Sequence, residues 1–334
     1  MSIFGSLRKA GINYRPGQLR ITRPLVVEAG ITLPVGIGTV YYLDPTNGAD
    51  TNDGLSPSQA FATLAVAYAA LTTLKNDALV ILYHGDAVAL TAAFTWAKSS
   101  CHLIGVGGPQ GGITKGVPIT MTSATATGLF VVSGDNNTFH NIHWSHLGTA
   151  AALISVGITG DGNSFHDCQF NNMNNAASAD EATMKGVTLD GCNNTSFFRC
   201  TIGGTETTRT DGAADMTIGA GTILGLYMED CIWIADLDAA ADGDHAFIEQ
   251  VADADLGDYA YLVRPTFINA GAVAALPDAM TVGAATTGFW LLRDPLLVYV
   301  TDIADNEEKV WIQGDGRDTT PGKFVGIAIN PDVA

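Results

Sequence analysis

Positive charge is scarce in this sequence. Only 15% of its 334 residues are charged, and 16 lysines and arginines stand against 34 aspartates and glutamates, so the net charge is −18. The phosphates of nucleic acids and the headgroups of anionic membranes repel a chain this acidic. We therefore expect that the main body of the protein binds neither nucleic acid nor a membrane.

Long apolar runs are missing as well. No segment stays apolar over the roughly 20 residues that a membrane-spanning helix needs. Residues 1–9, MSIFGSLRK, lack the apolar stretch of a secretory signal peptide. The sequence thus predicts synthesis in a cytosol, with 47% hydrophobic residues available for a sizeable core.

Cysteine is infrequent and odd in number. The five cysteines include no C-x-x-C pair, and an odd number cannot close completely into disulfides within one chain. Free, buried thiols are therefore predicted. A zinc site is the alternative, although zinc ligands usually come in closely spaced pairs. Its ligands would be Cys192, Cys200, His140 and His166.

The few basic residues are unevenly placed. Residues 1–27 hold five of them and no acid, so this segment is +5 and the remainder of the chain, which is −18 in total, is −23. Glycines and prolines interrupt any long helix there. The segment predicts either an extended arm that lies on a partner protein or a cap packed on the first turn of the body. The residues that would contact the partner are Arg8, Lys9, Arg15, Arg20 and Arg23.

One short sequence motif, which we call the repeated phrase, recurs with substitutions along the middle of the chain. It alternates apolar and polar residues, as a strand with one buried face does. Its copies are NTFHNIHW at 137–144, NSFHDCQF at 163–170 and TSFFRCTI at 195–202. The second apolar position recurs in steps of 26, 32, 31, 34 and 30 residues, at Ile142, Cys168, Cys200, Cys231, Pro265 and Pro295. The repeat therefore predicts one equivalent strand in each turn of a coil.

A strand repeat of this length predicts a parallel β-helix. Inward side chains of successive turns should stack into ladders, and cysteine suits such a ladder as a small apolar residue. Asparagines just before the strands favour left-handed corners. These are Asn136, Asn137, Asn163, Asn193 and Asn194.

The segment 41–64, YYLDPTNGADTNDGLSPSQAFATL, resembles the start of right-handed parallel β-helix proteins of the pectate-lyase-like superfamily. In those proteins a first strand is followed by an N-G-x-D-x-x-D-G-L-S-P loop and an A-F-x-T-L helix. The resemblance implies an all-β, single-stranded, right-handed solenoid with an N-terminal capping helix near residues 57–74. We divide the chain into a basic arm and first strand (1–40), the β-helix (41–295), and C-terminal strands (296–334) that close the solenoid or pair with a neighbour.

Two acidic segments are candidate calcium sites. The first is a loop that lacks the spacing of an EF-hand and whose side chains suit turns equally well. Its members are Asp44, Asn47, Asp50, Asn52 and Asp53. The second lies in the acidic run 236–258, where a solvated surface loop is the alternative to a calcium or catalytic site. Its candidates are Asp242, Asp244 and His245. We expect no cofactor, with calcium as the one alternative.

Two histidines occupy equivalent places in the repeated phrase. His140 and His166 should stack on neighbouring turns, with Phe198 in the next place. With Trp144 they could line a groove for carbohydrate, whereas the apolar Phe198 favours a ladder that serves packing.

The resemblance implies a fold used by enzymes that cleave polysaccharides, but the sequence presents no catalytic constellation and we assign no catalytic residue. The arm and the missing signal peptide favour a structural protein of a bacteriophage, namely a capsid decoration protein on the exterior of the virion, made in the host cytoplasm. Its partners would be other virion proteins and, in a homotrimer, further copies of itself. The alternative is a polysaccharide-binding or polysaccharide-degrading β-helix protein, a lyase or hydrolase such as a tailspike depolymerase, with a glycan as its ligand.

Overall fold

The computed structural model divides the chain into two compact units, residues 1–36 and residues 37–334. The residues that it describes are 12–15, 18–21, 38–109, 115–123, 128–148, 154–171, 184–209, 214–238, 245–252, 254–271, 276–283 and 287–313.

The first unit contains a two-stranded hairpin where the sequence predicts an extended arm. Strand β1 (Ile12–Arg15) pairs antiparallel with β2 (Gln18–Ile21). Arg15 lies opposite Gln18, and Arg20 lies opposite Asn13. The other predicted partner-binding residues, Arg8, Lys9 and Arg23, lie outside the described residues.

The second unit is a coil of three parallel sheets, which we call sheets I, II and III. Sheet I consists of β3 (Val40–Leu43), β4 (Asp77–Leu82), β7 (Cys101–Val106), β10 (Thr138–His140), β13 (Ser164–His166), β16 (Ser196–Phe198), β20 (Leu226–Glu229), β23 (Asp255–Val263), β26 (Thr287–Arg293) and β29 (Val310–Gln313), with β19 (Thr222–Ile223) paired to β23. Sheet II consists of β5 (Val88–Leu90), β8 (Val117–Met121), β11 (Ile142–His146), β14 (Gln169–Asn171), β17 (Thr201–Arg209), β21 (Ile232–Leu237), β24 (Thr266–Asn269) and β27 (Leu296–Val298). Sheet III consists of β6 (Phe94–Trp96), β9 (Gly128–Val132), β12 (Ile154–Ile158), β15 (Lys185–Leu189), β18 (Ala214–Ile218), β22 (Ala246–Gln250), β25 (Leu276–Val282) and β28 (Val300–Ala304).

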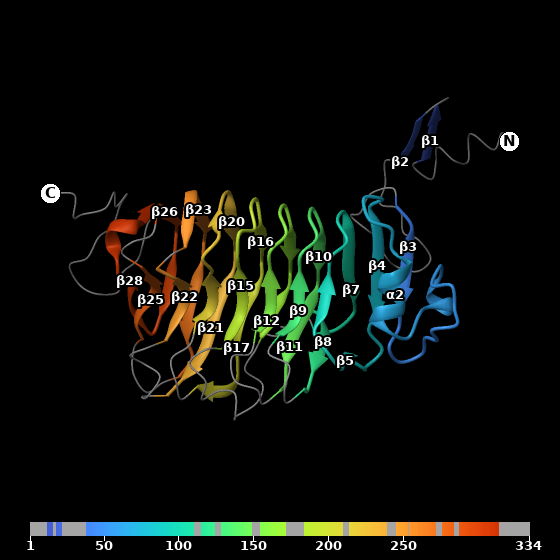
Figure 1. Ribbon diagram of the computed structural model, residues 1–334, viewed down its shortest axis with the longest axis horizontal. Helices are drawn as coiled ribbons and strands as arrows, with labels where there is room; N and C mark the ends of the chain where they lie inside the picture. The colour runs from blue at the N-terminus through green and yellow to red at the C-terminus, as the bar shows by residue number, and fades with distance from the viewer. Residues whose placement is uncertain are drawn as a thin grey trace. The chain divides into compact units, whose positions relative to one another are not determined.

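Each turn of the coil adds one strand to sheet I, one to sheet II and one to sheet III, as β10, β11 and β12 do. Figure 1 shows the turns side by side in chain order, with the colour running from blue at β3 to red at β28. Neighbouring strands within each sheet are parallel. The structure therefore confirms the parallel β-helix that the repeated phrase predicts.

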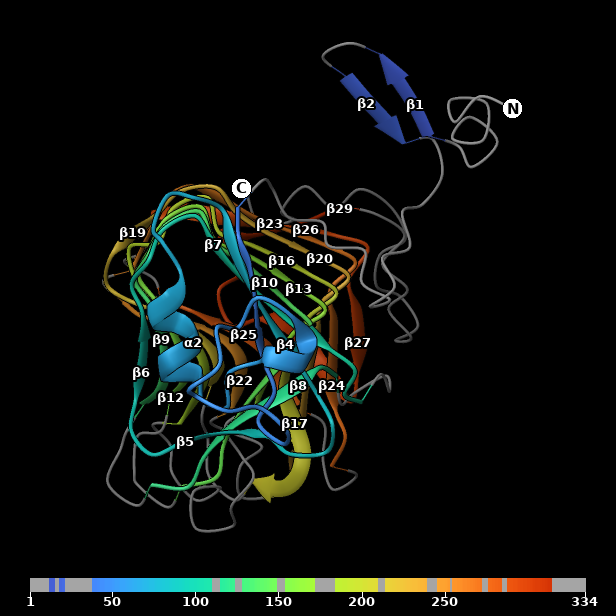
Figure 2. The same ribbon diagram turned by 90° about the vertical axis from the view of Figure 1, so that its right-hand side faces the viewer.

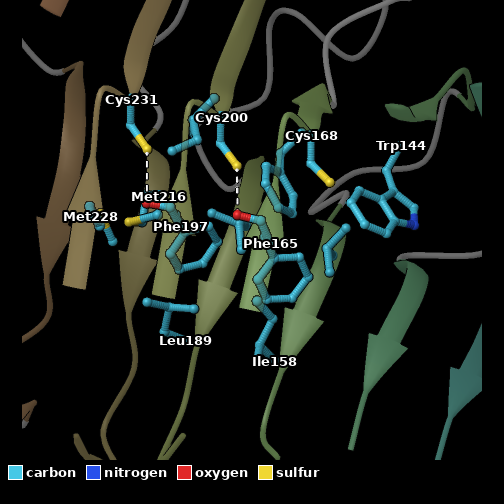
Figure 3. Close-up of a cluster of buried hydrophobic side chains, with 14 of the residues drawn as sticks. Trp144, Ile158, Phe165, Cys168, Leu189, Phe197, Cys200, Met216, Met228 and Cys231 are labelled. Carbon is cyan, nitrogen blue, oxygen red and sulfur yellow. Dashed lines mark hydrogen bonds between the residues drawn. The ribbon is translucent and has the colours of Figure 1, made fainter. Parts of the chain in front are cut away.

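The core is built from the ladders that the sequence predicts. Cys168, Cys200 and Cys231 are buried and follow one another on successive turns, because the residues after them pair in register. Figure 3 shows this row beside a second ladder from sheet I, in which Phe165 and Phe197 stack at 5.0 Å. Each of these ladders buries apolar side chains over many turns, and burial of this kind is the main source of stability of the coil.

All five cysteines are free and buried, as the odd count predicts. Burial raises the pKa of the Cys101 and Cys192 thiols to about 11, so these two remain protonated and unreactive at neutral pH. Cys192 and Cys200 lie in the core whereas His140 and His166 lie on the outside of sheet I, so the four residues of the zinc alternative do not meet.

The N-terminal end of the coil carries a short helix. The predicted helix near 57–74 is divided into the 3-10 turn η1 (Pro57–Gln59) and the α-helix α2 (Leu64–Ala70), which buries Leu64 and Ala67. Figure 2 looks along the coil from this end and shows α2 lying across it. The chain leaves the helix at Leu71, whose backbone is extended, and Lys98 caps the last carbonyls: Nζ donates to the carbonyl oxygens of Tyr68 at 2.7 Å and Ala69 at 3.1 Å.

The acidic loop before α2 forms turns. Asp44 Oδ1 accepts hydrogen bonds from the amides of Thr46 and Asn47 at 3.0 and 2.9 Å. Asp50 Oδ1 accepts from the amides of Ala62 and Thr63 at 3.0 and 2.9 Å, which ties the loop to the start of the helix. These bonds are the ones that the turn interpretation of this segment predicts.

The last described strands continue the coil. β27, β28 and β29 pair in parallel with β24, β25 and β26, so each of the three sheets gains one more strand; the 3-10 turn η2 (Glu307–Lys309) precedes β29. The rest of the predicted C-terminal segment, residues 314–334, lies outside the described residues. Among the described residues no helix has the length and apolar character to cross a bilayer.

Candidate functional site

On each strand of sheet I, the two residues that flank the buried ladder residue place their side chains on the outer face. Phe139, Phe165 and Phe197 point into the core, so the residues before and after each of them point outward. The register places His140, His166 and Phe198 in one outer row, as the sequence predicts.

Aromatic rings follow one another along this face. His140 stacks on His166 at 6.2 Å between centroids, His166 stacks on Phe198 at 4.7 Å, and Phe198 lies 5.6 Å from Tyr227. Tyr227 is 5.8 Å from Tyr261. These five rings come from β10, β13, β16, β20 and β23, so each strand in turn supplies one.

A second run of rings starts at Tyr259, two residues before Tyr261 on β23, and reaches the last strand of the sheet. Tyr259 stacks on Phe289 at 5.9 Å, and Phe289 stacks on Trp311 of β29 at 4.7 Å. We call the whole set the aromatic stripe, consisting of His140, His166, Phe198, Tyr227, Tyr259, Tyr261, Phe289 and Trp311. None of its members is buried, and Tyr259 and Trp311 are among the most exposed large side chains of the described residues, at 46% and 40%. A contiguous exposed aromatic surface of this kind usually marks a binding site.

Hydroxyl groups accompany the rings. Ser196 Oγ donates to Ser164 Oγ at 3.2 Å, and Ser164 Oγ lies 2.7 Å from Nε2 of His166. Burial lowers the pKa of His166, so its ring is neutral at pH 7 and can accept this bond. Further along the face, Tyr227 Oη donates to Glu229 Oε2 at 3.0 Å.

A ladder of charges borders the stripe at the corner between sheets I and II. The corner residue of each turn has a left-handed backbone, with φ between 51° and 56°, which turns the chain sharply from one sheet to the next. From Asp167 onward these residues alternate in sign. The corner residues are Asn141, Asp167, Arg199, Asp230, Arg264 and Asp294.

Each of the two arginines binds the aspartate of the turn before it. Arg199 donates from Nε and Nη2 to the two carboxylate oxygens of Asp167, both at 2.7 Å. Arg264 donates in the same way to Asp230 at 2.6 and 2.9 Å, and Nη2 also donates to Glu229 Oε1 at 2.7 Å. Burial raises the pKa of Asp167, but the bonds and charge of Arg199 outweigh this effect and lower it overall. The bond from Arg264 lowers the pKa of Asp230.

Trp144 does not belong to this face. Its side chain is fully buried and stacks on Phe170 in the core, with 5.1 Å between the ring centroids. Figure 3 shows Trp144 beside Cys168. The prediction that it lines a groove with the two histidines is therefore wrong. The signal was present in the sequence, because Trp144 stands two residues after the ladder residue Ile142 and so faces the same side of the strand.

His245 lies in a buried polar cluster at the corner between sheets II and III. Its Nδ1 is 3.2 Å from Nη1 of Arg209, its Nε2 is 3.6 Å from Oδ2 of Asp215, and Arg209 donates to Asp215. All three side chains are fully buried. Burial and the neighbouring Arg209 lower the pKa of His245. Asp242 and Asp244 lie outside the described residues.

This cluster could not be assembled from the sequence alone. Arg209 and Asp215 lie 36 and 30 residues before His245, and the three residues do not form a sequence motif with a known spacing. Only the pairing of β18 with β22, which sets Ala214 opposite Ala246, brings Asp215 beside His245. Among the described residues no group of three or more His, Cys, Asp or Glu side chains is arranged to hold a metal ion.

Comparison with known proteins identifies the fold. No protein-family model and no curated protein matches the chain. Among solved structures, pectate lyase Pel9A matches with a TM-score of 0.54 and 13% identity over 78% of this chain, which spans 64% of the lyase. Pectin methylesterase PemA from Erwinia chrysanthemi matches with a TM-score of 0.55 and 11% identity, covering 84% of this chain and 91% of that one.

The protein has the right-handed parallel β-helix fold that pectate lyase Pel9A and pectin methylesterase PemA also have. A pectin methylesterase in complex with a hexasaccharide has the same fold, with a TM-score of 0.56 and 11% identity over 85% of this chain and 92% of that one. Identities this low establish the β-helix and carry no residue from those enzymes onto this one. None of the three proteins is named as a virion component.

Proposed function

We propose that this protein binds a polysaccharide along the outer face of sheet I. The observation that carries the proposal is the aromatic stripe, which consists of two runs of contacting rings, one from β10 to β23 and one from β23 to β29. Neighbouring strands are about 4.8 Å apart, so the stripe offers a long and nearly continuous ring surface. An elongated polymer is the ligand that matches such a surface.

The chemistry of the face supports a sugar ligand. Aromatic rings pack well against the C–H faces of pyranose rings, because both surfaces are flat and apolar. The hydroxyls of Ser164, Ser196 and Tyr227 and the carboxylate of Glu229 lie beside the rings, where they can exchange hydrogen bonds with sugar hydroxyls. The occurrence of the same fold in a structure with a bound hexasaccharide adds general support.

Removing single rings tests the proposal. We expect Phe198→Ala and Tyr261→Ala each to weaken polysaccharide binding by about tenfold, because each deletes one stacking contact of about 1.4 kcal/mol. Isothermal titration or affinity electrophoresis with a panel of soluble polysaccharides measures this loss. The matched control is Tyr299→Ala, which removes a ring of 59% exposure from outside the stripe. Equal binding by the stripe variants and the control would contradict the proposal.

A second candidate function follows from the charge of the N-terminal segment. Residues 1–36 form a compact unit of their own, and residues 1–27 are +5 whereas the remainder is −23. This separation supports a segment that anchors the acidic coil on another protein, as in a capsid decoration protein on a virion exterior. Glycan binding and anchoring are compatible, since they use different parts of the chain.

Deleting residues 1–27 tests the anchor. The shortened protein should keep the circular dichroism and melting temperature of the coil, because the three sheets begin only at Val40. It should no longer co-sediment with the particle that carries the full chain, because five cations are lost. Unchanged co-sedimentation would exclude the anchoring role.

A further inference from the structure

We propose that the polysaccharide bound along the aromatic stripe is uncharged. This inference rests on the proposed function and specifies the class of ligand: a neutral glycan, as opposed to one that carries uronate, sulfate or sialic acid. Three observations lead to it, namely the pairing of the cations at the stripe, the charge of the chain, and the neutrality of the hydroxyl groups beside the rings.

The arginines that border the stripe are already occupied. A guanidinium recognises a carboxylate or sulfate by a planar pair of N–H donors. In Arg199 this pair binds Asp167, and in Arg264 it binds Asp230, with a further bond to Glu229. An anionic sugar would have to displace these carboxylates before it could bind either arginine.

The remaining cations at this corner are engaged too. Arg293 Nε lies 3.5 Å from Asp294 Oδ2, and Lys115 Nζ donates to the carbonyl oxygen of Arg199 at 2.9 Å. Among the described residues of the corner, four cations therefore stand beside four carboxylates, and the border of the stripe has no net positive charge. The members of the two sets are Lys115, Arg199, Arg264 and Arg293, and Asp167, Glu229, Asp230 and Asp294.

The charge of the whole chain acts in the same direction. From residue 28 onward the net charge is −23. A polyanion approaching the coil is repelled over about a Debye length, roughly 8 Å at physiological ionic strength. A neutral polymer meets no such barrier.

The hydroxyl groups among the rings are neutral. The chain of hydrogen bonds from Ser196 to Ser164 and on to the uncharged ring of His166 offers hydroxyl groups of the kind that sugar hydroxyls pair with. Stacking and neutral hydrogen bonds do not depend on ionic strength, whereas charge pairing does. Salt dependence therefore distinguishes the two ligand classes.

The test compares neutral and acidic polymers on the full-length protein. Soluble β-glucan, galactomannan and arabinan are titrated beside polygalacturonate, alginate and heparin, at about 0.1 M and about 1 M NaCl, where the Debye length is about 10 Å and about 3 Å. We expect at least one neutral polymer to bind with a Kd that changes less than about twofold with salt, and the Phe198→Ala variant to lose about tenfold in affinity.

The outcomes separate the two claims. Ring-dependent binding of an acidic polymer without binding of any neutral one would overturn the uncharged class and leave the proposed function standing. Binding of no polymer, or binding that ignores the ring substitutions, would overturn the proposed function and this inference with it.

A gain of function tests the pairing argument. The double variant Asp167→Asn/Asp230→Asn releases Arg199 and most of the donors of Arg264, so it should bind polygalacturonate about tenfold or more tightly at low salt, with binding of the neutral polymer unchanged. The control Asp53→Asn/Asp86→Asn removes the same charge from two exposed sites outside sheet I. Equal gains in the two double variants would contradict the role of the paired arginines.

Discussion

Single residues at the corner between sheets I and II set both the turn of the coil and the charge of its border. Asparagine and aspartate adopt the left-handed conformation readily, but Arg199 and Arg264 adopt it at a cost of about 1–2 kcal/mol each. Their bonds to Asp167 and Asp230 offset part of that cost, since an exposed ion pair contributes up to about 1 kcal/mol. The alternation of sign thus stabilises corners that the backbone alone disfavours.

His143 should make the stability of the coil sensitive to acid. It is buried in β11, and burial lowers its pKa to about 4. The unfolded chain takes up a proton near pH 6.5 but the folded chain does not until about pH 4, so lowering the pH through this window favours the unfolded state. Above pH 6.5 both states are neutral and the effect is absent.

Chemical unfolding at pH 7 and pH 4.5 measures this effect. Between the two pH values, the wild-type protein should lose about 2–3 kcal/mol more free energy of unfolding than His143→Gln, which cannot titrate. The control is His140→Gln, on the outer face of sheet I, which leaves His143 in place. The same pH dependence in wild type and His143→Gln would show that the buried ring does not behave in this way.

At the scale of one strand, two neighbouring phenylalanines of β16 should separate stability from binding. Phe197 is fully buried between Phe165 and the rest of the core, whereas Phe198 lies on the outer face. Phe197→Ala should lower the free energy of unfolding by about 3–5 kcal/mol because it leaves a cavity. Phe198→Ala should cost about 1 kcal/mol or less in stability while weakening glycan binding. A large stability loss in Phe198→Ala, with binding unchanged, would show that this row serves packing only.

The capping helix should depend on one lysine. Lys98 Nζ binds the last carbonyls of α2 and lies 4.7 Å from the centroid of the Tyr68 ring. Lys98→Met keeps the apolar stem and removes the ammonium, which should destabilise the helix end by about 1–2 kcal/mol. Hydrogen exchange followed by mass spectrometry should then show faster exchange over Leu64–Leu71 and unchanged exchange in β16. Uniformly faster exchange would mean that the lysine stabilises the whole coil. Unchanged exchange would mean that it stabilises neither the helix nor the coil.

The elements that repeat were predictable, and those formed by contacts between turns were not. The ladder through Cys168, Cys200 and Cys231 follows from the sequence, because each turn repeats an alternating strand around a fixed corner. The capping of α2 by Lys98 was not predictable, since Lys98 comes from the loop that follows β6. The aromatic stripe was found only as far as Phe198, because the next ring, Tyr227, stands in the neighbouring outer row.

At the scale of the whole molecule, charge and fold restrict the function together. The parallel β-helix provides three long, regular faces, and the sequence places rings that are not buried on successive strands from β10 to β29 on the outside of sheet I. The acidic coil and the paired arginines disfavour an anionic partner on that face. The basic N-terminal unit would suit an acidic partner protein, so the two proposed binding surfaces would differ in character.

A crystal structure with a bound neutral oligosaccharide, taken from the polymer that binds best, tests the central claim most directly. The account predicts sugar rings stacked on members of the aromatic stripe between His140 and Trp311, with their hydroxyls in contact with Ser164, Ser196 or Glu229. Oligosaccharide bound on sheet II or sheet III, with the outer face of sheet I unoccupied, would contradict it.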